Sequence, residues 1–450
     1  MNNVEQLRAQ NAQIFPSVVE DLKNIIQIPS VSAIPAHQQD VARSAQFVAD
    51  LFAAEGFDVE ICHANYEDGT PGRPAVLGHK HVSEDAPTVL LYAHHDVQPV
   101  GDESRWQSAP FDPVVRGDRL FGRGSADDGA GIMAHVGAVR LLGADLPVNV
   151  TVFIEGEEEI GSGSFQNFLA KYQDRLQADL IIVADSGNWQ VGTPAITTSL
   201  RGVVQMDVTL KVADHASHSG GFGGPMIDAV SLAAMLISTF WDENGDVAIA
   251  GLGGNDKAEV DYTEQQFRQD AGLLPGVKLA GTGDLAARLW TKPAVAVIGW
   301  DVRPLTEASN TIAPETTFRL SVRTVPGEDV AAAAAAISRH IKENVPFGAD
   351  VQVRINEQGP SYLANQSQAT QNLHDALSKA WQTEAVNIGQ GGSIPFIADF
   401  ASFFPDADVL VTGVEDPDSH AHSEDESVSL SDLENVVLAE ALLLQKTAGR

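Results

Sequence analysis

This chain of 450 residues has little cysteine and little positive charge. The single cysteine, Cys62, excludes an internal disulfide framework and every zinc motif built on several cysteines. Lysine and arginine total 28 against 61 aspartates and glutamates, which gives a formal net charge of −33. Such a balance repels phosphate backbones and anionic lipids, so we expect neither nucleic-acid binding nor membrane-surface binding. The abundant carboxylates are instead suited to binding cations.

Long hydrophobic runs are also absent. No apolar run approaches the ~20 residues of a membrane-spanning helix. Residues 1–25 lack the basic stretch and apolar core of a secretory signal. We therefore predict a cytoplasmic location. The chain is longer than the roughly 250–300 residues at which a single hydrophobic core stops growing, so two domains are expected.

Short apolar runs without alternation recur along the chain. Such runs predict strands buried on both faces, as in a mostly parallel sheet covered by helices. Apolar residues at helical spacing lie between them, which predicts an α/β fold. The predicted strands are 88–93, 149–154, 180–184 and 409–412, and the predicted helices are 16–26, 39–55, 129–142 and 164–176.

The middle of the chain has a different pattern, with strands that alternate as half-exposed strands do. The order strand, helix, strand, strand, helix, strand is ferredoxin-like. We therefore predict an inserted ferredoxin-like α+β domain at 200–358 and a discontinuous main domain at 1–199 plus 359–450. The strand candidates are 203–213, 317–325 and 350–355, and the helix candidates are 226–240 and 329–343, with a longer excursion at 241–292.

Side chains that bind cations follow each predicted buried strand. In open α/β sheets, ligands bind beyond the carboxyl ends of the strands, and carboxylates beside an apolar core need a partner there. Basic residues are scarce in these segments, so a metal ion is the simplest partner. The residues concerned are His94, His95 and Asp96, then Glu155 and 157–159, then Asp185, and finally Glu415, Asp416, Asp418, His420 and His422.

Asp127 and Asp128 lie in a glycine-rich turn, FGRGSADDGAG, that enters a predicted helix. A helix cap with negative charge near the helix dipole would explain them without a metal. A phosphate-binding loop is not expected, because two carboxylates would face the phosphate and no Gly-Lys-Ser/Thr follows.

The chain contains seven motifs, which follow one another from the N-terminus in this order: LLYAHHDVQP, GRGSADDGAG, EGEEEIGSGS, ASHSGGFGG, LSVRTVP, GGSIP and AHSEDE. Together they resemble the dinuclear zinc peptidase family of carnosinases, cytosolic nonspecific dipeptidases, glutamate carboxypeptidase, aminoacylase and succinyl-diaminopimelate desuccinylase. The resemblance runs from about residue 15 to the C-terminus. HHDVQP, DDGAG and the long excursion in the inserted domain are most similar to the dipeptidase branch.

The resemblance implies two divalent metal ions per subunit, held by five residues. His94 and Asp185 would bind one ion, Glu159 and His422 the other, and Asp127 would bridge both. Zinc is predicted, although sites of histidine and carboxylate also accept manganese or cobalt. The ions would acidify a shared water to hydroxide and polarise the scissile carbonyl.

Two further acidic residues have implied catalytic roles. Asp96 resembles the residue that orients the imidazole of His94, and Glu158 resembles the general base. Strand alternation alone would put Glu157 and Glu159 on one side, so the family's assignment requires the strand to end before Glu158. Glu157 remains an alternative for either role.

The resemblance also implies residues that bind a short peptide substrate. His218 would hydrogen-bond the attacked carbonyl, and Arg323 would bind the substrate's C-terminal carboxylate, for which a guanidinium is suited. Asn310 would contact the tetrahedral intermediate, and the loop at Gly392 and Ser393 would hold substrate. In such relatives the inserted domain acts as a lid and pairs two subunits, so we predict a homodimer in which His218 acts in trans.

Two departures from the dipeptidase pattern bear on specificity. Gly129 replaces a frequent lysine, and Gly389-Gln390 replaces a frequent Arg-Glu, so a cation beside the substrate is lost. The predicted function is metal-dependent dipeptide hydrolysis. The alternatives are a deacylase or carboxypeptidase acting on N-acyl amino acids, and a noncatalytic metal- or peptide-binding protein on the same fold.

Overall fold

The computed structural model describes residues 4–392 and 395–449. The chain divides into two compact units. The sequence predicts domains at 1–199 plus 359–450 and at 200–358; residue 199, residues 359–363 and the described residues of 388–398 group with the second unit instead of the first. Unit 1 contains the described residues of Met1–Thr198, Ala364–Asn387 and Asp399–Arg450, and unit 2 those of Ser199–Leu363 and Ile388–Ala398.

Unit 1 is built on a six-stranded sheet in the order β1-β2-β6-β3-β7-β17. Strands β6, β3, β7 and β17 are parallel neighbours, while β2 is antiparallel to both β1 and β6. The central strands are almost entirely buried, as their continuous apolar runs predict. The strands are β1 (Asp58–Cys62), β2 (Ala75–Lys80), β3 (Thr88–His94), β6 (Asn149–Glu155), β7 (Leu180–Val183) and β17 (Asp408–Val411).

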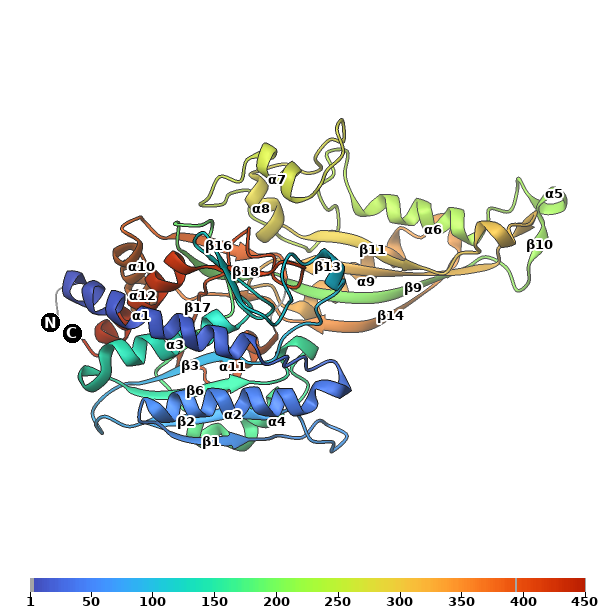
Figure 1. The fold of residues 1–450 in the computed structure, drawn as a ribbon. Helices are drawn as coiled ribbons and strands as arrows, with labels where there is room; N and C mark the ends of the chain where they lie inside the picture. The colour runs from blue at the N-terminus through green and yellow to red at the C-terminus, as the bar shows by residue number, and fades with distance from the viewer. Residues whose placement is uncertain (1–3, 393–394, 450) are drawn as a thin grey trace. The chain divides into compact units, whose positions relative to one another are not determined.

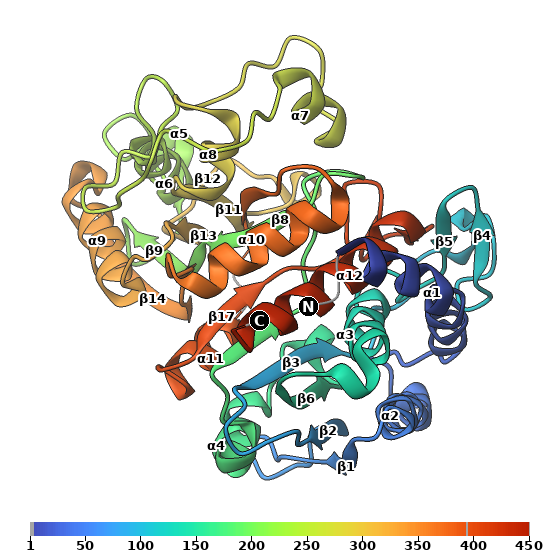
Figure 2. The same cartoon turned by 90° about the vertical axis from the view of Figure 1, so that its left-hand side faces the viewer.

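Helices cover both faces of this sheet, which confirms the predicted α/β class. Figure 2 shows α2 and α3 on one face and α4 on the other. Helix α3 also packs against α1 and α12, and α12 against α10. The helices are α1 (Val4–Ile26), α2 (Gln38–Ala54), α3 (Gly129–Leu142), α4 (Phe165–Leu176), α10 (Gln368–Trp381) and α12 (Leu430–Thr447).

Helix α1 is longer than the predicted helix 16–26. It continues through Pro16 back to Val4, because Leu7 and Asn11 extend its buried face by one residue per turn. A small antiparallel sheet, β18-β5-β4, completes this unit. Its strands are β4 (Val114–Arg116), β5 (Arg119–Phe121) and β18 (Ser427–Ser429).

Unit 2 has the ferredoxin-like arrangement predicted from its element order. Its antiparallel sheet has the order β11-β13-β9-β14, and α6 and α9 pack against it. Figure 1 shows β9, β13 and β14 running side by side. The elements are β9 (Gly202–Lys211), α6 (Ala229–Ile237), β11 (Ala294–Trp300), β13 (Glu315–Thr324), α9 (Val330–Glu343) and β14 (Asp350–Gly359).

Alternating burial in β9 and β13 places Val204, Met206, Phe318 and Leu320 in one apolar cluster beneath the two helices. The other elements of this unit are short: β10 (Ser217–His218), α5 (Ser219–Phe222), α7 (Glu264–Asp270), α8 (Leu285–Trp290), β12 (Thr311–Ile312) and β15 (Tyr362–Leu363). Three elements include residues of both units: β8 (Ala195–Leu200), β16 (Val386–Gln390) and α11 (Pro395–Phe403).

Candidate metal centre

The carboxyl ends of four adjacent parallel strands bring the predicted ligands of unit 1 together. Strand β3 ends at His94, and Asp185 follows β7 by two residues. The turn after β6 carries Glu158 and Glu159, and the loop after β17 leads to His422. Neighbouring parallel strands end at the same edge of a sheet, which is where ligands bind in open α/β folds.

Six residues form two groups that could each hold a metal ion. His94, Glu158 and Asp185 make one group, and Asp127, Glu159 and His422 make the other. Within each group one ligand atom per residue lies within 4.8 Å of the others.

Asp127 connects the two groups through its two carboxylate oxygens. Oδ1 lies 2.9 Å from Nε2 of His94, and Oδ2 lies 2.8 Å from Nε2 of His422. Nε2 of His422 is in turn 3.3 Å from Oε2 of Glu159, and Nε2 of His94 is 3.8 Å from Oδ1 of Asp185. One carboxylate therefore lies between two histidines that belong to different groups.

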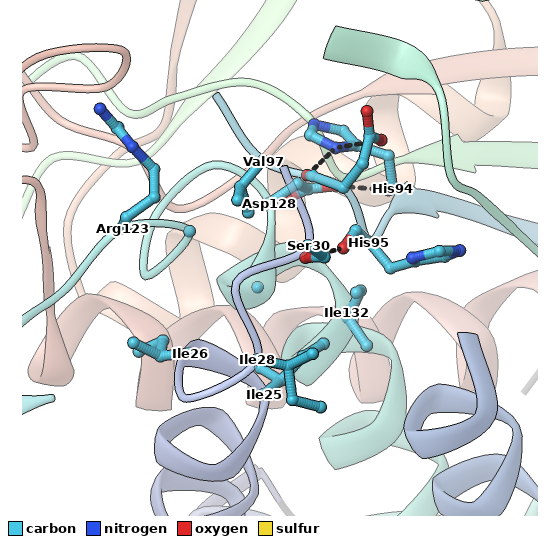
Figure 3. A pocket seen from close by; sticks show the side chains of 13 residues that line it. Ile25, Ile26, Ile28, Ser30, His94, His95, Val97, Arg123, Asp128 and Ile132 are labelled. Atoms are coloured by element: carbon cyan, nitrogen blue, oxygen red, sulfur yellow. Dashed lines mark hydrogen bonds and ion pairs between the residues drawn. The ribbon is translucent and has the colours of Figure 1, made fainter. Parts of the chain in front are cut away.

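A tight loop presents Asp127 at the N-terminus of α3. Gly124 has a φ of +79°, and a Cβ there would lie 2.6 Å from Cγ1 of Val97, so a side chain does not fit. The neighbouring Asp128 belongs to neither group: its carboxylate accepts the backbone N–H of His94 at 3.1 Å. Figure 3 shows this contact.

The acidic triplet is divided between structural and site positions. Strand β6 ends at Glu155, so strand alternation no longer applies when Glu158 and Glu159 enter separate groups. The carboxylate of Glu157 accepts the hydroxyl of Tyr66 at 2.8 Å and the backbone N–H groups of Arg73 and Ser164. Glu157 is thus held by neighbouring loops and lies outside both groups.

Asp96 contacts both His94 and the acidic turn. Nδ1 of His94 lies 3.0 Å from the backbone carbonyl oxygen of Asp96 and 3.5 Å from its carboxylate. The carboxylate instead accepts the backbone N–H groups of Glu158 and Glu159, each at 3.2 Å. Asp96 therefore faces Nδ1 of His94 with both its backbone carbonyl and its carboxylate, and the carboxylate also holds the acidic turn.

Electrostatics in the centre favour bound cations. Burial, followed by the charge of Asp185, raises the pKa of Glu158 to about 9, and burial with Asp127 raises that of Glu159 to about 7. Hydrogen bonds to Asp127 and Glu159 raise the pKa of His422 to about 11. Glu158, Glu159 and His422 therefore all hold protons tightly when no ion is bound. Bound divalent cations would take the place of these protons and offset the negative charge of the carboxylates.

The donor set fits such ions. Oε1 of Glu159 is buried and has no hydrogen-bond partner, so it is available as a ligand atom. Imidazole nitrogen and carboxylate oxygen suit zinc, manganese and cobalt. The other oxygen of Glu159 accepts from Nε2 of Gln98 at 2.7 Å. Gln98 lies in the HHDVQP motif, but nothing in the sequence indicated this contact.

The loop that carries His422 contains four other potential ligands, and none of them belongs to either group: Glu415, Asp416, Asp418 and His420. Asp416 forms an ion pair with Arg119 at 2.9 Å instead. Counting every cation-binding residue that follows a strand therefore overestimates the number of metal ligands.

A small cavity has His94 and Asp128 in its lining (Figure 3). Its volume is about 10 Å³, the size of one water molecule, and several isoleucine side chains line it. A cavity of this size cannot admit a dipeptide.

The predicted substrate residues lie in unit 2. His218, in β10, is exposed and its Nδ1 accepts the backbone N–H of Gly220; Asn310 is tied to the same turn because its carbonyl accepts the N–H of Ser219 at 2.9 Å. Gly392 is exposed, and Ser393 lies outside the described residues.

Arg323 is near the end of β13 and has a cationic neighbour that sequence analysis missed. Arg201 is buried, and burial followed by the charge of Arg323 lowers its pKa to about 10. Its guanidinium donates to the backbone carbonyls of Gly391 and Lys292, both at 3.3 Å. Two guanidinium groups near each other favour an anion.

No helix in the described part of the chain has the length and apolar character needed to span a bilayer. The fold and the two ligand groups together define an α/β protein with a candidate centre for two metal ions and a ferredoxin-like unit.

Comparison with known proteins identifies the family. Residues 90–446 match the model of peptidase family M20/M25/M40. The chain is 32% identical over 457 residues to a cysteinylglycine-S-conjugate dipeptidase of Corynebacterium striatum, covering 99% of both chains. It is 28% identical to the human Beta-Ala-His dipeptidase over 72% of this chain and 68% of the relative.

Solved structures share the fold. Human carnosine dipeptidase 1 has a TM-score of 0.77 at 23% identity, covering 99% of both chains. The di-peptidase Dug1p from Saccharomyces cerevisiae has a TM-score of 0.74 at 22% identity, covering 100% of this chain and 99% of that one. The chain therefore belongs to peptidase family M20/M25/M40 and is a metallopeptidase, as its ordered motifs predict.

Proposed function

We propose that this protein is a dipeptidase that cleaves short peptides with a free C-terminal carboxylate, using two zinc ions per subunit. The observation that carries the proposal is the placement of Asp127 between His94 and His422, each of which belongs to its own group of ligands. The dipeptidase names of the similar proteins support the substrate class.

Five residues would hold the ions: His94 and Asp185 for one, Glu159 and His422 for the other, and Asp127 between them. When bound, the ions would supply an acidified water and polarise the scissile carbonyl. Histidine and carboxylate ligands support zinc, and manganese and cobalt are compatible with the same donors.

Glu158, the third member of the group with His94 and Asp185, would act as the general base and not as a ligand. It would accept a proton from the attacking water and donate it to the departing amine. Asp96 would orient the imidazole of His94, whose Nδ1 it faces, and its carboxylate also holds the backbone N–H groups of Glu158 and Glu159.

Unit 2 would bind the substrate. Arg323, next to Arg201, would hold the free carboxylate, and the charge density of two guanidiniums supports this assignment. His218 and Asn310 would contact the carbonyl under attack. Gly392 and Ser393 would complete the substrate loop.

We further propose a homodimer formed through unit 2, with His218 of each subunit serving the other subunit's centre. A cytoplasmic location remains a prediction from the sequence.

A substrate panel tests the proposed function. Protein stripped with a chelator would be reconstituted with zinc, manganese or cobalt and assayed on Ala-Ala, Leu-Gly, Cys-Gly and β-Ala-His. N-acetyl and N-succinyl amino acids form the comparison set. We expect faster hydrolysis of dipeptides; preference for N-acyl amino acids would indicate a deacylase, and tight metal binding without hydrolysis would indicate a binding protein.

A further inference from the structure

The carboxylate of Glu426 is fully buried and accepts four hydrogen bonds from the loop that carries Asp127. Oε1 accepts the backbone N–H groups of Ala126 at 2.9 Å and Asp127 at 3.1 Å. Oε2 accepts the backbone N–H of Gly124 at 2.9 Å and Nη1 of Arg123 at 2.6 Å. All oxygens of this side chain are therefore used to hold one loop.

Arg123 balances the buried charge and extends the connection. It is 2% exposed, and its Nη2 donates to the backbone carbonyls of Pro99 and Ser423. The pair Arg123–Glu426 thus ties together the segment after β3, the loop before α3 and the loop of His422. A buried carboxylate whose two oxygens both accept hydrogen bonds holds the donor groups around it in place.

The two loops joined in this way carry two of the proposed ligands. Asp127 donates its own backbone N–H to Glu426, and His422 precedes Glu426 by four residues. The backbone of Gly122 also donates to the carbonyl of Glu426 at 2.9 Å, next to the pairing of β18 with β5. The loops of Asp127 and His422, whose side chains lie 2.8 Å apart, are therefore joined through a residue that belongs to neither ligand group.

We propose that Glu426 is a positioning residue for the metal centre: its hydrogen bonds to the backbone of 124–127 fix the carboxylate of Asp127 relative to His422, and so fix the geometry of the ligand group that these two residues share. The proposal rests on the metal centre of the proposed function. It assigns a role to the last residue of the AHSEDE motif.

The variant Glu426→Gln tests the proposal, with Glu440→Gln as its matched control. Glu440 is also buried and also pairs with a basic side chain, His135, at 2.9 Å, but it contacts no proposed ligand. Both variants remove one buried negative charge and leave a basic partner behind. A loss of general stability should therefore appear in both, whereas an effect on the centre should appear only in Glu426→Gln.

Cobalt is the probe, because its visible spectrum reports ligand geometry. For Glu426→Gln we expect cobalt affinity to fall about tenfold or more, as for other residues that orient metal ligands. We also expect a changed cobalt spectrum and a lower kcat with little change in KM. Glu440→Gln should lower the melting temperature and leave cobalt affinity, spectrum and kcat at 25 °C near wild type.

Wild-type cobalt affinity and spectrum in Glu426→Gln, or equal losses in both variants, would overturn the proposal. Should Glu426→Gln fail to fold, Glu426→Asp decides, since it keeps the charge but shortens the side chain away from the backbone N–H groups of 124–127. Cobalt affinity should then fall to a smaller extent, and unchanged affinity would contradict the role. Cobalt binding is measured without substrate, so this result stands even if the wild type cleaves no dipeptide.

Discussion

Oδ2 of Asp127 lies 2.8 Å from Nε2 of His422, yet the two side chains differ greatly in exposure. The carboxyl side chain of Asp127 is 8% exposed and the imidazole of His422 is 57% exposed. The centre thus joins a rigid, buried carboxylate to a histidine on an accessible loop.

Replacing the bridging ligand should affect both ions. We expect Asp127→Ala to lower metal content and thermal stability together, because ions that bind only the folded state stabilise it. An ion present at about 100 times its Kd contributes about 2.7 kcal/mol. Elemental analysis and calorimetry measure the two effects, and full metal content in this variant would assign the bridge to another group.

The general base can be separated from the ligands. Glu158→Gln should lower kcat by at least ~10²-fold while both ions stay bound, because an amide cannot accept the proton. Glu157→Gln is the matched control: its carboxylate is held by Tyr66, Arg73 and Ser164 outside the centre, so turnover should persist. Near wild-type turnover of metal-replete Glu158→Gln would remove the residue from this role.

The buried ion pair between His135 in α3 and Glu440 in α12 should make the stability of the fold depend on pH. Burial alone would lower the pKa of His135, but the carboxylate of Glu440 raises it above the ordinary value. A raised folded-state pKa contributes stability that is fully present below the unfolded pKa of about 6.5. This contribution is lost as pH rises through the folded-state pKa of His135.

The difference in unfolding free energy between wild type and His135→Leu should therefore shrink as pH increases. Denaturant unfolding of both proteins at several pH values measures this difference. A difference that stays constant or grows with pH would show that His135 is not an imidazolium in the folded protein.

The substrate carboxylate provides another test. Arg323→Ala should raise KM for free dipeptides, and C-terminal amidation should make them poor substrates for the wild type. Arg319→Ala is the control on the same strand, because Arg319 pairs with Asp207 and should leave KM unchanged. Equal KM values for free and amidated dipeptides with the wild type would rule out a carboxylate anchor.

Much of the fold was accessible from the sequence because its signals are local. Continuous apolar runs locate β3, β6, β7 and β17, and glycine-bounded helical spacing locates α3. Strand β11 was not identified, since this edge strand carries exposed apolar residues such as Ile298 without alternation. The N-terminal half of α1 was missed because Pro16 indicates a helix start.

The centre was accessible only in part. For residues that directly follow a strand, such as Asp185, the sequence predicts their place at the edge of the sheet, because parallel strands end at one edge. The contacts of Asp96 with the turn of Glu158, and of Glu426 with the loop of Asp127, depend on how distant loops pack. No local pattern encodes such backbone contacts, and the same is true of Arg201 beside Arg323.

The trans role of His218 leads to the last prediction. His218 belongs to unit 2, whereas every proposed metal ligand and Glu158 belong to unit 1. His218→Ala and Glu158→Ala should each be nearly inactive alone. In a mixed dimer, the subunit with the His218 substitution keeps its own Glu158 and receives the histidine of its partner, so one of the two sites works. Random pairing makes half of the dimers mixed, so co-refolding equal amounts should restore about a quarter of wild-type activity.

If His218 serves its own subunit, every site lacks either its base or its histidine. Purified mixed dimers without activity would therefore contradict the trans assignment, and a monomeric wild type in solution would do the same.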